Sequence, residues 1–168
     1  MSTEKVLASV FKRVFEVPIN PKRFEDQLCM QKAAYFLKQM EMACGEYRFF
    51  WFLHGPYSTR LDFDTKMISN DVATELPIEF EENHEKGLDA LKKLFEVPPQ
   101  SHEPQEKVYS KAEWVETLAS LDYIQKYLLI PSTKEELLNK FIKCKPDLKN
   151  QELNSLALDS LSNFSYAF

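Results

Sequence analysis

The residues best suited to chemistry lie in one short corner of the sequence, His54-Gly55-Pro56-Tyr57-Ser58. A histidine is a general base near neutral pH, and a serine close to it would be a nucleophile. A catalytic triad, however, needs a nucleophile, a base and an orienting group that converge, and residues this close in sequence converge only through a specific turn. Ser58 also lacks the surrounding glycines of a nucleophile elbow. An enzyme with its site at His54 and Tyr57 therefore ranks behind other functions.

The corner is better explained as a structural turn between a strand and a helix than as a catalytic site. It follows an apolar run, Phe49 to Leu53, and the aromatic residues of this run predict a strand over 46–53. The run does not alternate, so both faces of the strand are expected to be buried. We expect Gly55 to adopt a positive φ and Ser58 to cap a helix over 59–69. Whether His54 is structural or functional stays open.

Two polar residues, Gln31 and Lys32, interrupt a helix predicted over 20–45, with Asn20 as its N-cap and Gly45 at its end. A helix that is apolar nearly all round lies in the middle of a fold. A buried Gln31 needs hydrogen-bond partners, and the backbone of the aromatic strand is the expected one. The Lys32 ammonium is expected to reach outward to water. The apolar residues are Phe24, Leu28, Met30, Ala33, Ala34, Tyr35, Phe36, Leu37 and Met40.

The rest of the chain reads mainly as helix. An acidic and apolar alternation predicts a strand over 75–82 that pairs with 46–53. Helices are expected over 3–16 and 83–96, after capping boxes at Ser110–Glu113 and Ser132–Glu135, and after Asn150. The predicted fold class is mainly α (α+β): a single-domain helical bundle over 1–168 around a central apolar helix, with a short two-stranded ribbon that would suit a winged helix. A Pro-rich segment at about 97–109 is expected to be an exposed loop.

Composition limits the function classes. The chain has 168 residues, a net charge of −5 and a pI near 5.3, which disfavours nucleic-acid and membrane partners. Its three cysteines show no metal-ligand spacing, and no cofactor or metal motif is found. The N-terminal residues do not have the pattern of a signal peptide, so a cytoplasmic location is expected.

The segments LCMQKAAYFLKQM and YRFFWFLHGPYSTRLDFD resemble the YwgA-like family of small prokaryotic proteins, and the resemblance extends over most of residues 24–160. A more distant likeness is to the SocA-like (Panacea) antitoxin domains. The resemblance implies a fold and a cytoplasmic prokaryotic or phage setting, and it brings no catalytic residues. The matching residues are Leu28, Gln31, Lys32, Tyr35, Phe52, Gly55, Pro56, Tyr57, Ser58 and Leu61.

The sequence therefore favours a non-enzymatic protein-interaction or regulatory module, in a toxin–antitoxin or phage–host context, whose partner is another protein. The alternative is a winged-helix-like DNA-binding transcriptional regulator, in which the ribbon of 46–53 and 76–80 lies beside helix 58–69. Acidity and the lack of a recognition helix rich in Arg and Lys count against the alternative. The candidate partner-binding residues are Gln31, Lys32, Tyr35, Trp51, His54, Gly55, Pro56, Tyr57 and Ser58.

Overall fold

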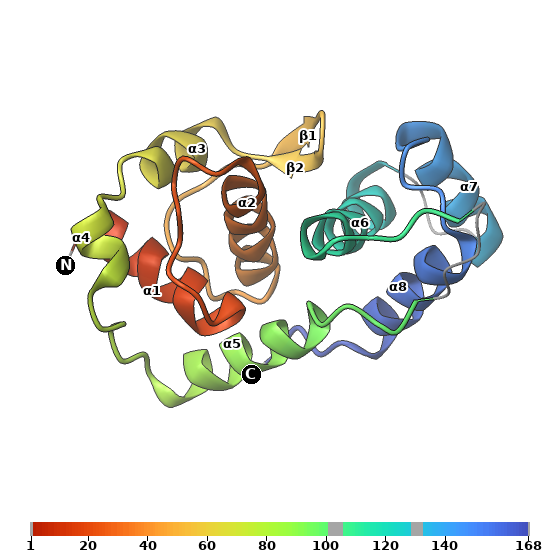
Figure 1. Ribbon diagram of the computed structural model, residues 1–168. Coiled ribbons are helices and arrows are strands. Elements are labelled where there is room, and N and C mark those ends of the chain that lie inside the picture. Colours follow the sequence, from red (N-terminus) through yellow and green to blue (C-terminus); the bar gives the residue numbers. More distant parts are fainter. Residues whose placement is uncertain (1, 101–105, 129–132, 168) are drawn as a thin grey trace. The chain divides into compact units, whose positions relative to one another are not determined.

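The computed structural model describes residues 2–100, 106–128 and 133–167, and within these ranges the chain is mainly helical with one two-stranded antiparallel sheet (Figure 1). The predicted fold class, mainly α with a short ribbon, is confirmed. The chain forms two compact units, Met1–Lys93 with Ser165–Phe168, and Leu94–Phe164. A single folding domain over 1–168 stays a prediction.

The first unit is built around one buried helix. Helix α2 (Phe24–Gln39) contacts α1 (Thr3–Phe15), α3 (Thr59–Lys66) and strand β2 (Gly55–Tyr57), which Figure 1 shows gathered around it. Every residue of α2 from 28 to 37 is buried. The predicted central helix is therefore confirmed. The other elements of this unit are β1 (Phe50–Phe52), α4 (Asn70–Thr74) and α5 (Glu82–Leu94), apart from the last residue of α5.

Both predicted ends of the central helix were wrong. The helix begins at Phe24, because the Asn20 side chain accepts a hydrogen bond from the Lys22 N–H at 3.1 Å and forms a separate turn. At the other end, the Met42 N–H bonds the Leu37 carbonyl at 2.8 Å. This bond closes the helix early, and Glu41 rather than Gly45 takes the left-handed conformation, with φ 58°.

The predicted pairing of 46–53 with 75–82 was also wrong. Strand β1 pairs with β2, so that Phe50 lies opposite Tyr57 and Phe52 opposite Gly55. Residues 75–81 form no strand, and Leu76 is 87% exposed. Strand β1 pairs with β2 rather than with 75–82 because a two-residue turn costs less loop-closure entropy than a connection of more than twenty residues.

The helices that flank α2 begin and end close to their predicted positions. Helix α1 is capped by Ser2. Two ion pairs join α5 to α1 and to its C-cap residue, Glu16: Arg13–Glu85 and Lys92–Glu16. Helix α3 is capped by Ser58, as predicted. It ends at Lys66 rather than at 69, because Ser69 caps the separate helix α4.

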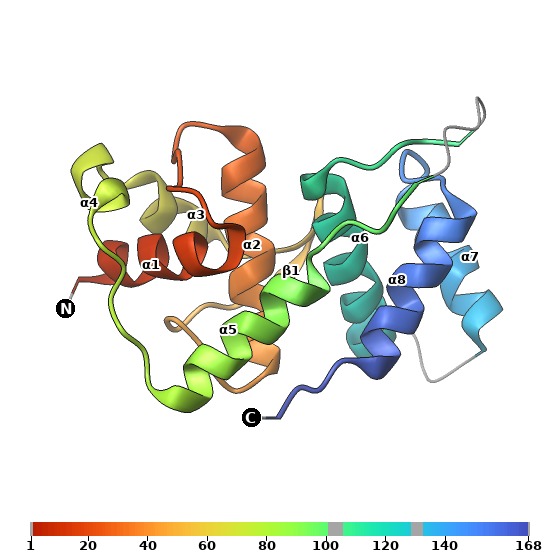
Figure 2. The same cartoon turned by 60° about the horizontal axis from the view of Figure 1, so that its bottom comes forward.

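The second unit packs α6 (Lys111–Tyr123) against α7 (Lys134–Cys144) and α8 (Gln151–Asn163), which Figure 2 shows side by side. A π-helical segment, η1 (Ile124–Leu128), follows α6 directly. Ser110 and Glu113 form the predicted capping box, and Asn150 caps α8 as predicted. Ser132 lies outside the described residues, and Thr133 caps α7 in its place.

The Pro-rich segment falls partly outside the described residues, which omit 101–105. Its described ends are tied together by one side chain. The Gln100 amide donates to the Tyr109 carbonyl at 2.8 Å and accepts from the Tyr109 N–H at 2.7 Å. The exposed loop predicted over 97–109 is therefore described only at its two ends.

The Glu113 carboxylate in the capping box of α6 should make the stability of the chain depend on pH. Burial would raise the pKa of Glu113, but hydrogen bonds and charge from Lys107, together with the Ser110 N–H, lower it below its ordinary value. A lowered folded-state pKa adds stability above the unfolded-state pKa, and this stability is lost as pH falls through the folded-state pKa. In Glu113→Gln, which keeps a capping side chain, the melting temperature should fall at pH 7. The difference from the parent chain should shrink below about pH 4. An equal difference at pH 7 and pH 3 would contradict this account.

Candidate functional site

The corner that the sequence singles out forms the turn and second strand of a β-hairpin. Leu53 and His54 make the two-residue turn between β1 and β2. Gly55 has φ 88°, which confirms the predicted positive φ. Side chains with a Cβ rarely adopt such a φ, and glycine adopts it without strain.

Helix α2 holds the hairpin through two consecutive side chains. The Gln31 amide donates to the Ser58 carbonyl at 2.9 Å and accepts from the Ser58 N–H at 2.8 Å. The Lys32 ammonium donates to the Pro56 carbonyl at 2.7 Å. Gln31 thus has a backbone partner, but this partner is Ser58, just beyond β2, rather than the aromatic strand. The predicted outward reach of Lys32 was wrong, because Lys32 is only 1% exposed and its ammonium has a carbonyl within reach.

The outward face of the hairpin carries three aromatic side chains, Phe50, Phe52 and Tyr57, which we call the aromatic cluster. The ring centroids of Tyr57 lie 5.7 Å from Phe50 and 5.1 Å from Phe52, and those of Phe50 and Phe52 lie 6.1 Å apart. Phe50 and Phe52 are 43% and 48% exposed. The cluster is a preformed apolar surface in contact with water.

The prediction that both faces of the aromatic strand are buried was wrong. Exposure alternates along β1: Phe50 and Phe52 are exposed, and Trp51 between them is half-buried. Phe49, before the strand, contacts the buried Tyr35 at 5.6 Å between ring centroids. Alternate residues therefore face the protein, and the intervening ones face water.

A pocket of about 290 Å³ lies between α2, the hairpin and α3. At the hairpin turn, the His54 ring packs edge-on against Phe24, the first residue of α2, with centroids 5.1 Å apart. Both residues line the pocket. Its apolar lining comes from Phe24, Leu28, Phe52, Leu53 and Tyr57, and its charged lining comes from Lys32, Asp62 and Lys66.

Asp62 interacts with two other side chains of the pocket, Lys66 and Tyr57. Its carboxylate accepts a hydrogen bond from the Lys66 ammonium at 2.8 Å, one helical turn along α3. Burial raises the pKa of Tyr57, and the charge of Asp62 and a hydrogen bond to it raise this pKa further. The Tyr57 hydroxyl therefore keeps its proton at neutral pH and can donate a hydrogen bond.

The structure brings four of the nine candidate partner-binding residues together in one pocket. Gln31, Lys32, His54 and Tyr57 line this one pocket. Tyr35, by contrast, is fully buried and packs edge-on against Phe36, so it belongs to the core. Sequence reasoning missed Phe24, Asp62 and Lys66 as members of the site. The i,i+4 spacing of Asp62 and Lys66 was a usable signal, whereas the exposure of Phe24 was not visible in the sequence.

Ser58, the possible nucleophile of the corner, is engaged as a helix cap. The Ser58 hydroxyl is buried and accepts the Leu61 N–H at 3.2 Å as the cap of α3.

In the described part of the chain, no three His, Cys, Asp or Glu side chains form a group that would hold a metal ion. None of the described helices has the length and apolar character to span a membrane.

Comparison with protein-family models, curated proteins and solved structures finds no significant match. The resemblance to the YwgA-like family therefore stays a prediction.

Gly55→Val should destabilise the chain by about 1–3 kcal/mol, because valine resists the positive φ of this position. Gly55→Asn should cost less, because asparagine tolerates such conformations better than β-branched residues do. Chemical denaturation of both variants measures the two costs. Equal stability of the valine variant and the parent chain would show that the turn does not require glycine.

Gln31→Glu should destabilise the fold at pH 7 by at least about 1–3 kcal/mol, because a carboxylate would face the Ser58 carbonyl without a proton to donate. A protonated carboxyl restores the donor, so the deficit relative to the parent chain should shrink at pH 4. The folded-state pKa of the new carboxyl would be raised, and such a group loses stability as pH rises. Denaturant titrations of both proteins at each pH provide the measurement, and a deficit independent of pH would contradict the pairing.

Proposed function

We propose that the chain is a non-enzymatic protein-interaction module and that the outward face of the hairpin is its docking surface. The observation that carries the proposal is the aromatic cluster, together with Leu53, which is 72% exposed. Grouped exposed apolar side chains with a polar margin are typical of protein-binding surfaces. Exposed strands of this composition are otherwise protected by charged residues or by covering segments.

The cluster has the properties of an interface hot spot. Aromatic side chains bury much area for few rotatable bonds, and they dominate the energetics of many interfaces. The bonds from Gln31 and Lys32 fix β2, which reduces the entropy that binding would otherwise cost. A partner would thus meet a surface that is already in its binding geometry.

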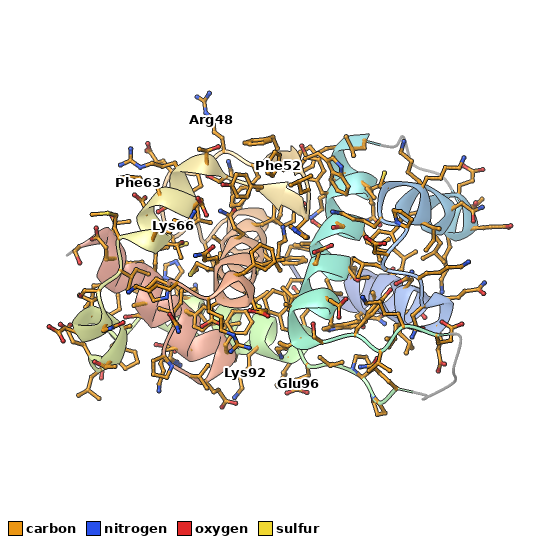
Figure 3. All side chains as sticks on the ribbon, turned by 45° about the horizontal axis from the view of Figure 1, so that its top comes forward. Arg48, Phe52, Phe63, Lys66, Lys92 and Glu96 are labelled. Atoms are coloured by element: carbon orange, nitrogen blue, oxygen red, sulfur yellow. The ribbon has the colours of Figure 1, made fainter. Side chains whose placement is uncertain are left out.

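Polar side chains border the aromatic face. Figure 3 shows Arg48 extending away from the ribbon, Phe52 on the hairpin and Lys66 on α3. Arg48 is exposed, and Lys66 is held by Asp62. An apolar centre with a charged margin is the usual anatomy of a protein–protein interface.

The alternative, a winged-helix DNA-binding regulator, has weaker support. Its expected ribbon of 46–53 with 76–80 does not form, since β1 pairs with β2. The helix beside the hairpin, α3, carries two basic side chains, and each is paired with an acidic one: Arg60 with Asp64 and Lys66 with Asp62. A helix that binds the major groove presents cations to phosphates instead.

The resemblance to antitoxin domains supports a regulatory role, in which the partner is a protein whose activity the chain restrains. A toxin, or a phage or host protein, would fit this role. The cytoplasmic location expected from the sequence is part of the same proposal.

The proposal is tested by photocrosslinking in cells that naturally make the chain. A photoreactive phenylalanine analogue at position 52 should give adducts that resist nuclease and are lost on protease treatment. The same analogue at position 76, where Leu76 is 87% exposed on a segment between α4 and α5, is the matched control. Nucleic-acid adducts at position 52, or equal protein adducts at both positions, would overturn the proposal.

A pair of substitutions then tests the energetics. Phe52→Ser should weaken capture of the crosslinked partner at least tenfold, because the loss of a hot-spot aromatic typically costs about 2 kcal/mol or more. Leu76→Ser makes the same kind of change and should leave capture unaltered. Neither substitution removes a buried side chain, so both melting temperatures should stay near that of the parent chain. Unchanged capture by Phe52→Ser would count against the docking surface.

A further inference from the structure

We propose that a second pocket of the first unit, where the chain leaves α2 and meets α5, binds a soft monovalent metal ion, Cu(I), through Cys44, Met42 and His84. The three side chains line one cavity of about 130 Å³, which we call the thiol pocket. This volume is well below the roughly 300–1,000 Å³ typical of pockets for organic ligands, and it suits an ion. The thiol pocket shares no residue with the aromatic cluster, so this inference is independent of the docking surface.

The turn after α2 brings the two sulfur side chains to one pocket. The Met42 N–H bonds the Leu37 carbonyl and Glu41 takes the left-handed conformation, so the chain leaves the axis of α2 here. Met42 and Cys44 follow in a segment that is neither helix nor strand, and they are two residues apart. Both line the thiol pocket, together with the Leu37 side chain of α2.

Helix α5 meets the Met42 thioether at Gly87. A Cβ at this position would lie 2.5 Å from the Met42 Sδ, so a residue without a side chain is needed for the sulfur to come this close to the helix. His84 precedes Gly87 by three residues and therefore lies on the same face of α5. The imidazole and the thioether thus reach the thiol pocket at one face of one helix.

The donor set favours a soft ion. Thiolate and thioether ligands select soft ions such as Cu(I), and imidazole binds copper as well. Calcium and magnesium need oxygen ligands, and no carboxylate is among the described residues that line the pocket. The other lining residues are all apolar: Val6, Val10, Leu37, Ala43, Phe80 and Leu88.

Charge distinguishes Cu(I) from zinc. Burial raises the pKa of the Cys44 thiol to about 12, so without metal the thiol keeps its proton at pH 7. When Cu(I) binds, the S–H bond breaks, its proton passes to water, and the sulfur electron pair forms the bond to copper. One positive charge replaces another, and no electron is transferred. A zinc ion would instead add a positive charge among apolar side chains, which is costly.

A neighbouring cavity presents acidic side chains next to the proposed ligands. It has a volume of about 570 Å³ and shares Met42 and His84 with the thiol pocket. The exposed residues Glu41 and Glu81 line it, and no lysine or arginine is among its described lining residues. Carboxylates that line a cleft raise the local concentration of cations. A cation is therefore attracted to the side of the site that Met42 and His84 form.

Competition for Cu(I) tests the inference on the reduced full chain, in the absence of oxygen. The competing chelator is bicinchoninate, whose Cu(I) complex is coloured, and the parent chain should withdraw one equivalent of the ion. Cys44→Ser should weaken binding by about a hundredfold or more, because even the loss of a hydrogen-bond partner of a metal ligand typically costs about 10–100-fold in affinity. Cys144→Ser removes a thiol that does not line the pocket, and it should leave the affinity unaltered. A parent chain that withdraws no Cu(I), or two variants that bind alike, would overturn the proposal.

Further variants separate a site of three ligands from a single reactive thiol. Met42→Leu removes the thioether at nearly constant volume, and it should weaken binding by about tenfold or more. Met40→Leu makes the same change at a buried methionine that does not line the thiol pocket, and should leave the affinity unaltered. His84→Gln changes a half-buried side chain and should also weaken binding by about tenfold or more. If Cys44→Ser alone weakens binding, copper binds a lone thiol and the proposed site is wrong.

The choice of ion and the place of binding are tested together. Zn(II) should bind the parent chain by about a hundredfold or more less tightly than Cu(I), because its extra charge would be buried without a partner. Zinc binding as tight as that of Cu(I) would contradict the assignment. On addition of Cu(I), the amide chemical shifts of 42–44 and 84–88 should change most. Changes confined to other parts of the chain would show binding elsewhere and would overturn the site.

Discussion

The pairing of the Gln31 amide with both backbone groups of Ser58 is the interaction on which the surface of the first unit depends. Ser58 ends the hairpin and begins α3, so one side chain of α2 fixes the positions of three elements. The Ser58 carbonyl also accepts the Asp62 N–H at 3.0 Å, so the group that depends on Gln31 is the buried Ser58 N–H. Leaving this N–H unpaired would cost more than the bond itself contributes. Lys32 adds a third bond from the next residue of the helix, to Pro56.

This anchoring explains how a short hairpin can leave aromatic side chains in water. An isolated two-stranded hairpin is marginally stable, and additional packing is needed to hold it. Here α2 supplies that packing from one side, through hydrogen bonds to β2 and the residue that follows it. The aromatic cluster is therefore not needed to hold the hairpin against α2, and its exposure is a cost that the fold tolerates. Such a cost is expected where a surface has a function.

Local rules predicted the local features of this chain. The caps at Ser58, Ser110 and Asn150, and the positive φ of Gly55, follow from residue type and immediate neighbours, and the structure confirms them. The central position of α2 followed from its apolar composition. At these positions the physical cause lies within about four residues. The start of α2 is an exception, because the turn at Asn20 is also local and was not predicted.

Features that depend on distant contacts were not predictable in this way. The burial of Lys32 depends on a carbonyl that lies 24 residues away. The exposure of Phe50 and Phe52 depends on which face of the hairpin meets α2, and an unbroken aromatic run does not specify that face. The members of the pocket were missed for the same reason, since Phe24 and Asp62 meet only after α2, the hairpin and α3 have packed.

Hydrogen exchange of the Ser58 backbone amide tests the central claim most directly. If Gln31 holds this group in the folded state, the Ser58 N–H should exchange as slowly as amides in the buried part of α2, such as that of Tyr35, because all of them would open only on large-scale unfolding. The amides of the exposed hairpin turn should exchange much faster. Exchange of Ser58 at the rate of the turn would show that the hairpin is not fastened to α2, and the account of the aromatic surface would be wrong.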